Sequence, residues 1–144
     1  MTNEFVTAGV NLRFSYAAGE AASRFLIALR DEIKIYGTRC PGCRRVLVPA
    51  RSFCPRCFVV TSEWIAVGPA GTLIAFAATR DFPLALVRLD GADTALVHRI
   101  NAANADALRI GLRVVLVFAE TRAGNILDIA YFKPEEPNMP NLAK

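Results

Sequence analysis

All four cysteines of the chain lie in one short stretch, RCPGCRRVLVPARSFCPRC, where they form two C-P-x-C pairs. Cys40 and Cys43 make the first pair, and Cys54 and Cys57 make the second. Two cysteines at this spacing place both sulfurs on one side of a tight turn, and two such turns close a tetrahedral four-sulfur site around zinc. A closed site leaves no position for water or substrate, so we expect it to fold the chain rather than to catalyse a reaction.

Other uses of these cysteines are open at this point. A redox C-x-x-C pair usually occurs once, two disulfides would suit a secreted chain, and iron uses the same four sulfur ligands as zinc. The first residues, MTNEFVTAGVNLRF, contain no basic region followed by an apolar block, so we expect no signal peptide and a cytoplasmic location. Structural zinc is therefore the cofactor that the pattern favours.

The cysteine stretch also carries five arginines and no acidic residue. Arginine binds phosphates and carboxylates through its planar fork, so these side chains are candidates for an anionic ligand or an acidic partner. The alternative is a solvated basic face on a chain whose formal net charge is +4. The five candidates are Arg39, Arg44, Arg45, Arg51 and Arg56.

A helix and an arm precede the cysteine stretch in the predicted order. Residues 18–33 have a helical period, with Ala22, Phe25, Leu26 and Leu29 on one face. Gly37 is expected to mark the break before the first cysteine pair. The first 14 residues show no strong period and are interpreted as an arm. We therefore expect an N-terminal arm and helix over residues 1–36, followed by a zinc ribbon over 37–61.

Short β-rich runs separated by glycine, proline and aspartate follow the ribbon. With a short helix expected at 101–108, they favour a Greek-key barrel of the OB type, and a small sandwich is the alternative. The fold class is thus mainly β with an N-terminal helix: a rubredoxin-like zinc ribbon, a five- to six-stranded OB-type barrel over residues 62–133, and a tail over 134–144. The predicted strands are 62–67, 72–79, 84–90, 94–100, 113–120 and 126–132, with turns at 68–71 and 90–93.

Catalytic motifs are not found in this sequence. It has neither a glycine-rich phosphate loop nor a G-x-S-x-G motif. His98 is the only histidine and lies in a predicted strand, which favours an ordinary strand residue over a general base. Asp90 and Asp93 flank a turn, where aspartate usually serves the turn itself. We expect no catalytic residue on this chain.

The order of these segments resembles the acyl-CoA-associated family of zinc-ribbon plus OB-fold proteins, long known as a domain of unknown function. The paired cysteines, Pro49 before the second pair and the LDG turn carry the resemblance over residues 20–133. Members of the family often have two prolines where this chain has Pro49 and Ala50, a departure that touches no cysteine. One similar group is the small zinc-finger subunit of benzoylsuccinyl-CoA thiolase.

The resemblance implies a non-catalytic accessory subunit whose partner is a thiolase-like catalytic chain. Thiolase chemistry needs a cysteine nucleophile of low pKa, and every cysteine here is claimed by the metal, so the nucleophile would lie on the partner. The resemblance also gives the five arginines a candidate ligand, because the phosphates of a CoA thioester suit arginine forks. An acidic surface of the partner would suit them equally.

Two other functions are weighed against this one. A single-stranded nucleic-acid binder would fit the zinc ribbon, the OB fold and the pI of about 9.1, but few aromatic residues are available for base stacking and lysine is scarce. A self-standing enzyme using His98 and Asp93 would lack a second base or nucleophile. The acyl group, the stoichiometry and the choice between zinc and iron are not specified by the sequence.

Overall fold

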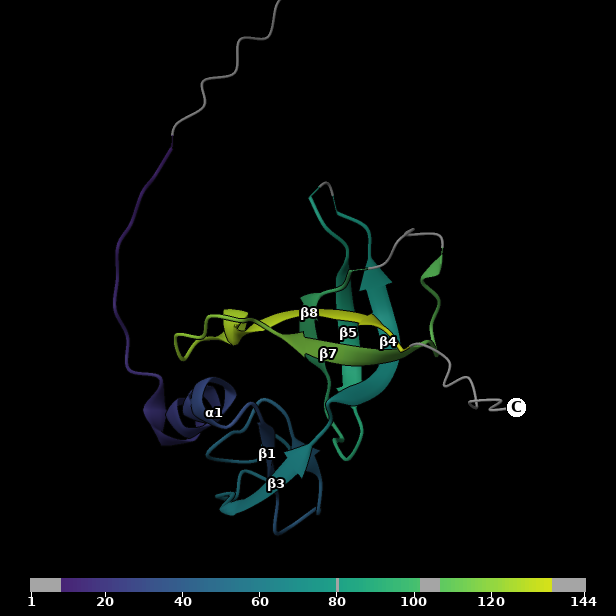
Figure 1. Cartoon of the computed structure of the whole chain (residues 1–144). Coiled ribbons are helices and arrows are strands. Elements are labelled where there is room, and N and C mark those ends of the chain that lie inside the picture. The colour runs from purple at the N-terminus through teal and green to yellow at the C-terminus, as the bar shows by residue number, and fades with distance from the viewer. Residues whose placement is uncertain (1–8, 80, 102–106, 136–144) are drawn as a thin grey trace, which may run out of the picture.

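The computed structural model describes residues 9–79, 81–101 and 107–135. Within them, one α-helix and a three-stranded sheet form one end of the molecule, and a five-stranded sheet forms the other (Figure 1). Most of the helix predicted at 101–108 and nearly all of the predicted tail lie outside the described residues. No helix in the described ranges is long and apolar enough to cross a lipid bilayer.

The predicted N-terminal helix is confirmed as α1, Gly19–Asp31. Its buried residues, Ala21, Phe25, Ala28 and Leu29, recur at the spacing of one helical face. The prediction had placed Ala22 and Leu26 on that face, and both are only half-buried. The helix therefore presents a face turned by about one residue from the one expected, and this face covers the core.

The ribbon sheet contains three antiparallel strands in the order β2-β1-β3: β1 (Ile35–Arg39), β2 (Val46–Leu47) and β3 (Glu63–Val67). We expected β3 to open the barrel, but all five of its residues pair with β1. Gly37 does not mark a break, because it lies buried in the middle of β1. A Cβ atom there would lie 2.8 Å from the carbonyl oxygen of Leu47, so only glycine allows β2 to approach this closely.

The second sheet has the strand order β6-β5-β4-β7-β8, with every neighbour antiparallel. Its edge strands β6 and β8 meet through a single parallel bridge between Ile100 and Phe132, beside a 2.7 Å hydrogen bond from Asn101 N–H to Phe132 O. The sheet has five strands, as the prediction allowed, but it is an open, curved sheet rather than a continuously paired barrel. Its strands are β4 (Ala70–Ala77), β5 (Leu84–Leu89), β6 (Leu96–Arg99), β7 (Arg113–Phe118) and β8 (Ile129–Pro134), and the 3-10 helix η2 (Ile126–Asp128) precedes β8.

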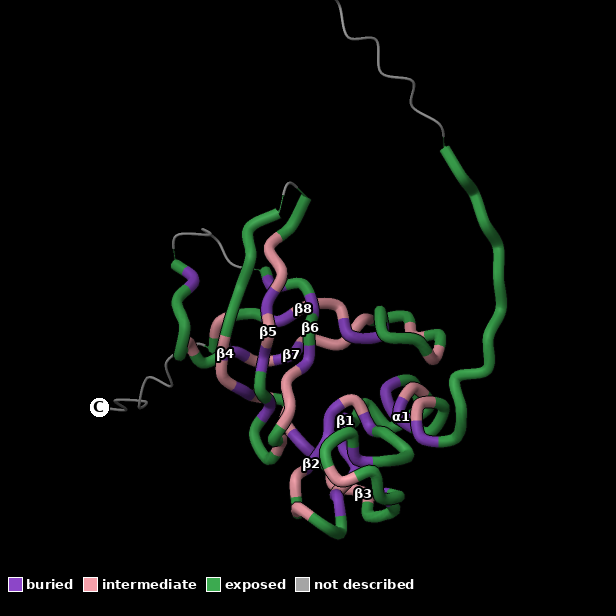
Figure 2. The backbone as a smooth tube through the Cα atoms, turned by 180° about the vertical axis from the view of Figure 1, so that it is seen from behind, coloured by how far each residue is buried: buried purple, intermediate pink, exposed green. Residues whose placement is uncertain are grey.

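One hydrophobic core runs through the helix, the ribbon sheet and the five-stranded sheet, which we call the barrel sheet. It joins Leu29 of α1 and Ile35 of β1 to Leu73, Val87 and Phe132 of the second sheet, all at most 2% exposed. The buried segments of Figure 2 accordingly lie where the elements face one another. Because apolar burial is the main stabilising contribution, we expect the two sheets to unfold together.

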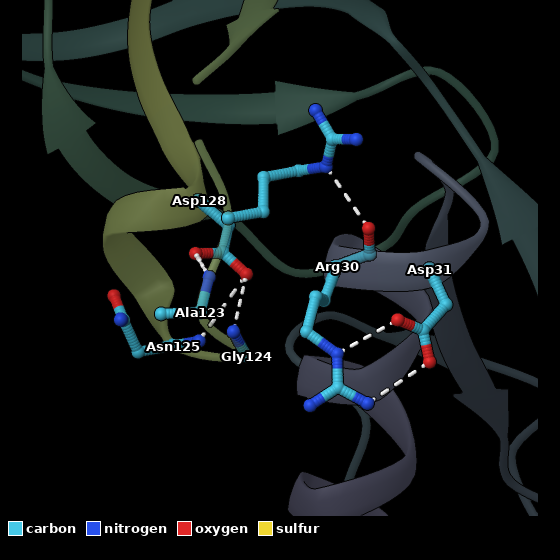
Figure 3. Close-up of polar contacts among 7 residues, drawn as sticks. Arg30, Asp31, Ala123, Gly124, Asn125 and Asp128 are labelled. Atoms are coloured by element: carbon cyan, nitrogen blue, oxygen red, sulfur yellow. Dashed lines mark hydrogen bonds and ion pairs between the residues drawn. The ribbon is translucent and has the colours of Figure 1, made fainter. Parts of the chain in front are cut away.

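A polar joint holds the loop before η2 against the end of α1. The buried carboxylate of Asp128 accepts hydrogen bonds from the backbone N–H groups of Ala123 and Gly124, both at 2.8 Å, and of Asn125 at 3.3 Å (Figure 3). The adjacent Arg122 donates through Nε to the backbone carbonyl of Arg30 at 2.9 Å. The last turn of α1 is thereby fixed to the barrel sheet.

Candidate metal centre and basic ribbon surface

The four cysteines predicted as metal ligands lie together in the structure. Their Sγ atoms all lie within 4.8 Å of one another, and the Sγ atoms of Cys43 and Cys54 are 3.8 Å apart. Zinc–sulfur bonds of about 2.3 Å in a tetrahedron place neighbouring sulfurs about 3.8 Å apart. The cluster therefore has the dimensions of a tetrahedral four-sulfur metal site.

The two cysteine turns are built in the same way. The N–H of Arg44 donates to Cys40 O, and the N–H of Phe58 donates to Cys54 O, both at 2.9 Å. Arg44 and Phe58 occupy equivalent positions, four residues after the first cysteine of each pair, and both have positive φ angles, of 65° and 55°. Positive φ is unfavourable for residues with a Cβ atom, so both turns contain local backbone strain. The two turns form the same backbone hydrogen bond, which explains why the C-P-x-C motif occurs in both of them.

The thiols of the cluster perturb one another's pKa values because their sulfur atoms lie so close together. Backbone N–H groups, chiefly that of Cys57, lower the pKa of the Cys54 thiol to about 6. Hydrogen bonding with Cys43, together with burial, raises the pKa of the Cys57 thiol to about 12. Without a cation, four thiolates at this distance would repel one another, whereas a divalent ion stabilises all four. The donor set therefore fits the zinc that the spacing predicted.

All four cysteines are free thiols in the structure, so the two-disulfide alternative is wrong. Cys40 and Cys54 are completely buried and pack with Leu47 in a small core of their own. This burial excludes solvent from the centre of the cluster. It suits a structural site better than a reactive thiol, which needs access to its substrate.

Two of the five arginine candidates are already engaged within the chain. Arg39 makes an ion pair with Glu63 of β3, with 2.8 Å between Nη1 and Oε1. Arg45 donates through Nη2 to the backbone carbonyl of Asp93 at 3.0 Å. Both contacts join the ribbon to residues far away in the sequence, and neither arginine is fully available to a ligand.

The other three arginines are exposed, and two of them, Arg51 and Arg56, belong to a surface that the sequence did not reveal. Arg44, Arg51 and Arg56 are exposed, and within the described ranges their side chains make no hydrogen bond or ion pair. Close to Arg51 and Arg56 in the chain, the stretch around the second cysteine pair exposes large apolar side chains: Phe58 is 81% exposed and Val60 is 73% exposed. We call this surface the ribbon tip and define it as Arg51, Phe53, Arg56, Phe58 and Val60.

A hollow of about 390 Å³ lies between the ribbon tip and the start of α1. Glu20, Ala21 and Arg24 of the helix line one part of it. Trp64 lies in its wall, with the Arg24 guanidinium 4.2 Å from the centre of the indole ring. The hollow therefore connects the beginning of α1 with the ribbon tip at Val60. The remaining lining residues are Ser52, Val60, Thr61 and Ser62.

His98 and Asp93, the residues weighed for catalysis, engage different backbone groups. His98 is buried, its Nε2 atom lies 3.3 Å from Ile126 O, and its Nδ1 atom has no partner in the described residues. The Asp93 carboxylate accepts a hydrogen bond from Val46 N–H at 2.8 Å. The contact with Val46 gives Asp93 a structural role, whereas one buried nitrogen of His98 stays without a partner in the described residues.

Comparisons with known proteins match both halves of the chain. The model of the ChsH2 rubredoxin-like zinc ribbon domain matches residues 28–59, and that of the ChsH2 C-terminal OB-fold domain matches residues 59–119. None of the curated proteins matches the chain.

Two solved structures share the fold. A protein of unknown function from the DUF35 family of Sulfolobus solfataricus is 21% identical, with a TM-score of 0.61 over 81% of this chain and 87% of the other. A structure described as an Ltp2-ChsH2(DUF35) aldolase is 20% identical, with a TM-score of 0.62 over 83% of this chain and 98% of the other. The two family models together span residues 28–119, and the chain belongs to the ChsH2 family, in which a rubredoxin-like zinc ribbon precedes an OB-fold domain.

Proposed function

We propose that this chain is a non-catalytic accessory subunit of a thiolase-like complex that processes acyl-CoA substrates. The observation that carries the proposal is the gathering of all four cysteines into one closed cluster in a ChsH2-family fold. Carbon–carbon bond chemistry on thioesters by a thiolase needs a reactive cysteine and a base. Since neither is available here, both belong to a partner chain. The structure named Ltp2-ChsH2(DUF35) aldolase, in which a ChsH2 protein is named together with Ltp2, supports this assembly.

In this proposal, Cys40, Cys43, Cys54 and Cys57 hold one structural zinc ion. The ion would fix the two strained turns and thereby present the ribbon tip in one conformation. The complex would reside in the cytoplasm, where thiols stay reduced and available to a metal.

A narrower proposal concerns the substrate and the arginines. We assign the complex to the thiolytic cleavage of a 3-oxoacyl-CoA such as benzoylsuccinyl-CoA, as in the similar subunits of aromatic degradation. Arg44, Arg51 and Arg56 would contact the CoA phosphates or acidic residues of the partner, because they are exposed and no side chain in the described ranges neutralises them. Arg39 and Arg45 would support the ribbon instead.

The experiment isolates the tagged chain with its partner from the native cells and assays the complex and each separated chain with CoA and a 3-oxoacyl-CoA. We expect thiolysis by the partner or the complex and none by this chain alone. Thiolysis by this chain alone would contradict the accessory role, whereas a complex that only cleaves by a retro-aldol reaction would correct the reaction class.

A triple variant tests the arginines. Replacing Arg44, Arg51 and Arg56 by alanine should raise the KM for CoA or weaken the complex by about tenfold or more, as expected for lost charge-assisted contacts. The matched control removes the same charge elsewhere, through Arg88→Ala, Arg109→Ala and Lys133→Ala, and should change neither quantity. Equal effects of both triple variants would indicate a general effect of charge rather than a site.

A further inference from the structure

The segment before α1 has the pattern of a β-strand without a sheet. From Val10 to Tyr16, apolar residues alternate with Asn11, Arg13 and Ser15. The segment runs away from the folded body in Figure 1 and is exposed along its whole described length in Figure 2. The four apolar side chains, Val10, Leu12, Phe14 and Tyr16, are 78%, 76%, 80% and 80% exposed.

Strict alternation is the pattern of a strand with one buried face, and it has no use in a solvated coil. Seven residues in extended conformation span about 23 Å, a usual length for one strand. Phe14 and Tyr16 already lie on one side, with ring centroids 6.3 Å apart. Such a segment gains its missing hydrogen bonds and its apolar cover together when it joins the edge of another sheet.

The position of the segment favours the same partner that the ribbon tip would contact. It leads directly into Gly19 at the start of α1, and the first turn of α1 borders the hollow that continues to the ribbon tip. A partner that covers this hollow would therefore lie close to the point where the segment joins α1. Two aromatic side chains alone would add about 300–500 Å² to such an interface, against about 800 Å² for one side of a standard complex.

We propose that residues 10–16 add as a β-strand to a free sheet edge of the catalytic partner, with Val10, Leu12, Phe14 and Tyr16 filling apolar pockets on that chain. This inference rests on the proposed function, since it names how the same partner is held. A second copy of this chain is the less suitable occupant, because the segment carries Arg13, the ribbon tip carries two arginines and each copy has a net charge of +4. The matching partner edge is apolar with an acidic rim.

The test uses the complex isolated from native cells as the probe. The double variant Leu12→Asp and Phe14→Asp should weaken partner binding by about 100-fold or more, since it places two charges in apolar pockets. The matched control, Asn11→Asp with Ser15→Asp, puts the same charge on the opposite face of the segment and should retain binding within about tenfold. All four side chains lie outside the folded body, so both variants should unfold at the temperature of the unchanged chain.

Hydrogen exchange supplies the sharper readout. In an added edge strand, every second amide donates to the neighbouring strand, so protection over residues 10–16 in the complex should alternate along the chain. Alternating protection together with the selective loss of binding supports the inference.

Three results would overturn it. A stable complex in which these amides exchange freely and the Leu12/Phe14 variant binds normally leaves the accessory function standing and removes the strand addition. A dimer of this chain that the same variant dissolves replaces the partner by a second copy. Failure of the unchanged chain to form any complex rejects the proposed function and the inference together.

Discussion

Asp93 continues the hydrogen bonding of the ribbon strand β2: its carboxylate accepts from Val46 N–H at 2.8 Å, and its own N–H donates to Val46 O at 2.9 Å. Thr94 extends the joint, since its hydroxyl accepts from Val48 N–H at 2.7 Å and donates to Val48 O at 3.0 Å. The turn between β5 and β6, which follows the LDG motif, is therefore the place where the barrel sheet is hydrogen-bonded to the ribbon. The expectation that Asp93 serves its own turn missed this longer-range contact.

We predict that Asp93→Ala lowers the free energy of unfolding by roughly 1–2 kcal/mol, because the backbone N–H of the buried Val46 loses a charged acceptor. Thermal unfolding of the zinc-loaded chain measures the change. Glu120→Ala, which removes the same charge at an exposed position, is the control and should have little effect. Equal free energies of unfolding for the two variants would mean that the contact between Asp93 and Val46 does not stabilise the chain.

Removing the metal should destabilise the whole chain rather than the ribbon alone, since Ile35 and Val46 of the ribbon share one core with Leu73 and Val87. We expect elemental analysis to find one zinc ion per chain, and Cys54→Ser to lose it. Circular dichroism during chelation should show one transition in which both sheets are lost. A barrel that stays folded after the metal is removed would show that the core is divided, and iron in place of zinc would correct the metal.

Phe58 offers a test of the strain in the second cysteine turn. Its φ angle is 55° and its side chain is 81% exposed, so glycine relieves the backbone at little loss of burial. We predict that Phe58→Gly raises the free energy of unfolding by about 0.5–1 kcal/mol. Phe58→Ala removes the same ring but keeps the strain, so it should not be stabilising. Both variants remove the exposed ring, so both should weaken partner binding. Stability and binding would then change independently of each other.

His98 should make stability depend on pH. Burial, assisted by the charge of Arg99, lowers the pKa of His98 below its ordinary value of 6.5. Below pH 6.5 the unfolded chain takes up a proton that the folded chain does not. Stability is therefore complete above pH 6.5 and falls as the pH drops from 6.5 through the lowered value. His98→Leu should remove this component. The free energy of unfolding in urea would be measured for both chains at pH 7.5 and 5.5. Loss of metal in acid affects both chains equally, so it cancels in the comparison. An unchanged pH dependence in the variant would contradict the assignment.

The parts of the fold that the sequence predicted depend on local patterns. The C-P-x-C repeat determines each cysteine turn within a few residues, so the metal cluster could be identified from spacing alone. The helix at Gly19–Asp31 follows from its period. The strand at Glu63–Val67 was also identified, but alternation shows that a strand exists and does not show which strand it pairs with.

The parts that were missed depend on distant contacts. Arg39 meets Glu63 across 24 positions and Arg45 meets Asp93 across 48, so no local pattern distinguishes these arginines from the exposed Arg44, Arg51 and Arg56. The break predicted at Gly37 is wrong because glycine is used both in turns and in strands that approach a neighbour closely, and the sequence does not distinguish the two uses. The alternation at residues 10–16 was missed because the predicted arm covers residues 1–14. That range includes residues before the alternation and cuts off its last two positions.

The most direct test of the central claim is the native mass of the tagged chain after isolation from its own cells at moderate salt, with identification of every bound component. The account predicts a stoichiometric complex with a thiolase-like chain, held together without nucleic acid. Recovery of the chain alone, or bound to single-stranded nucleic acid that salt releases, would contradict it.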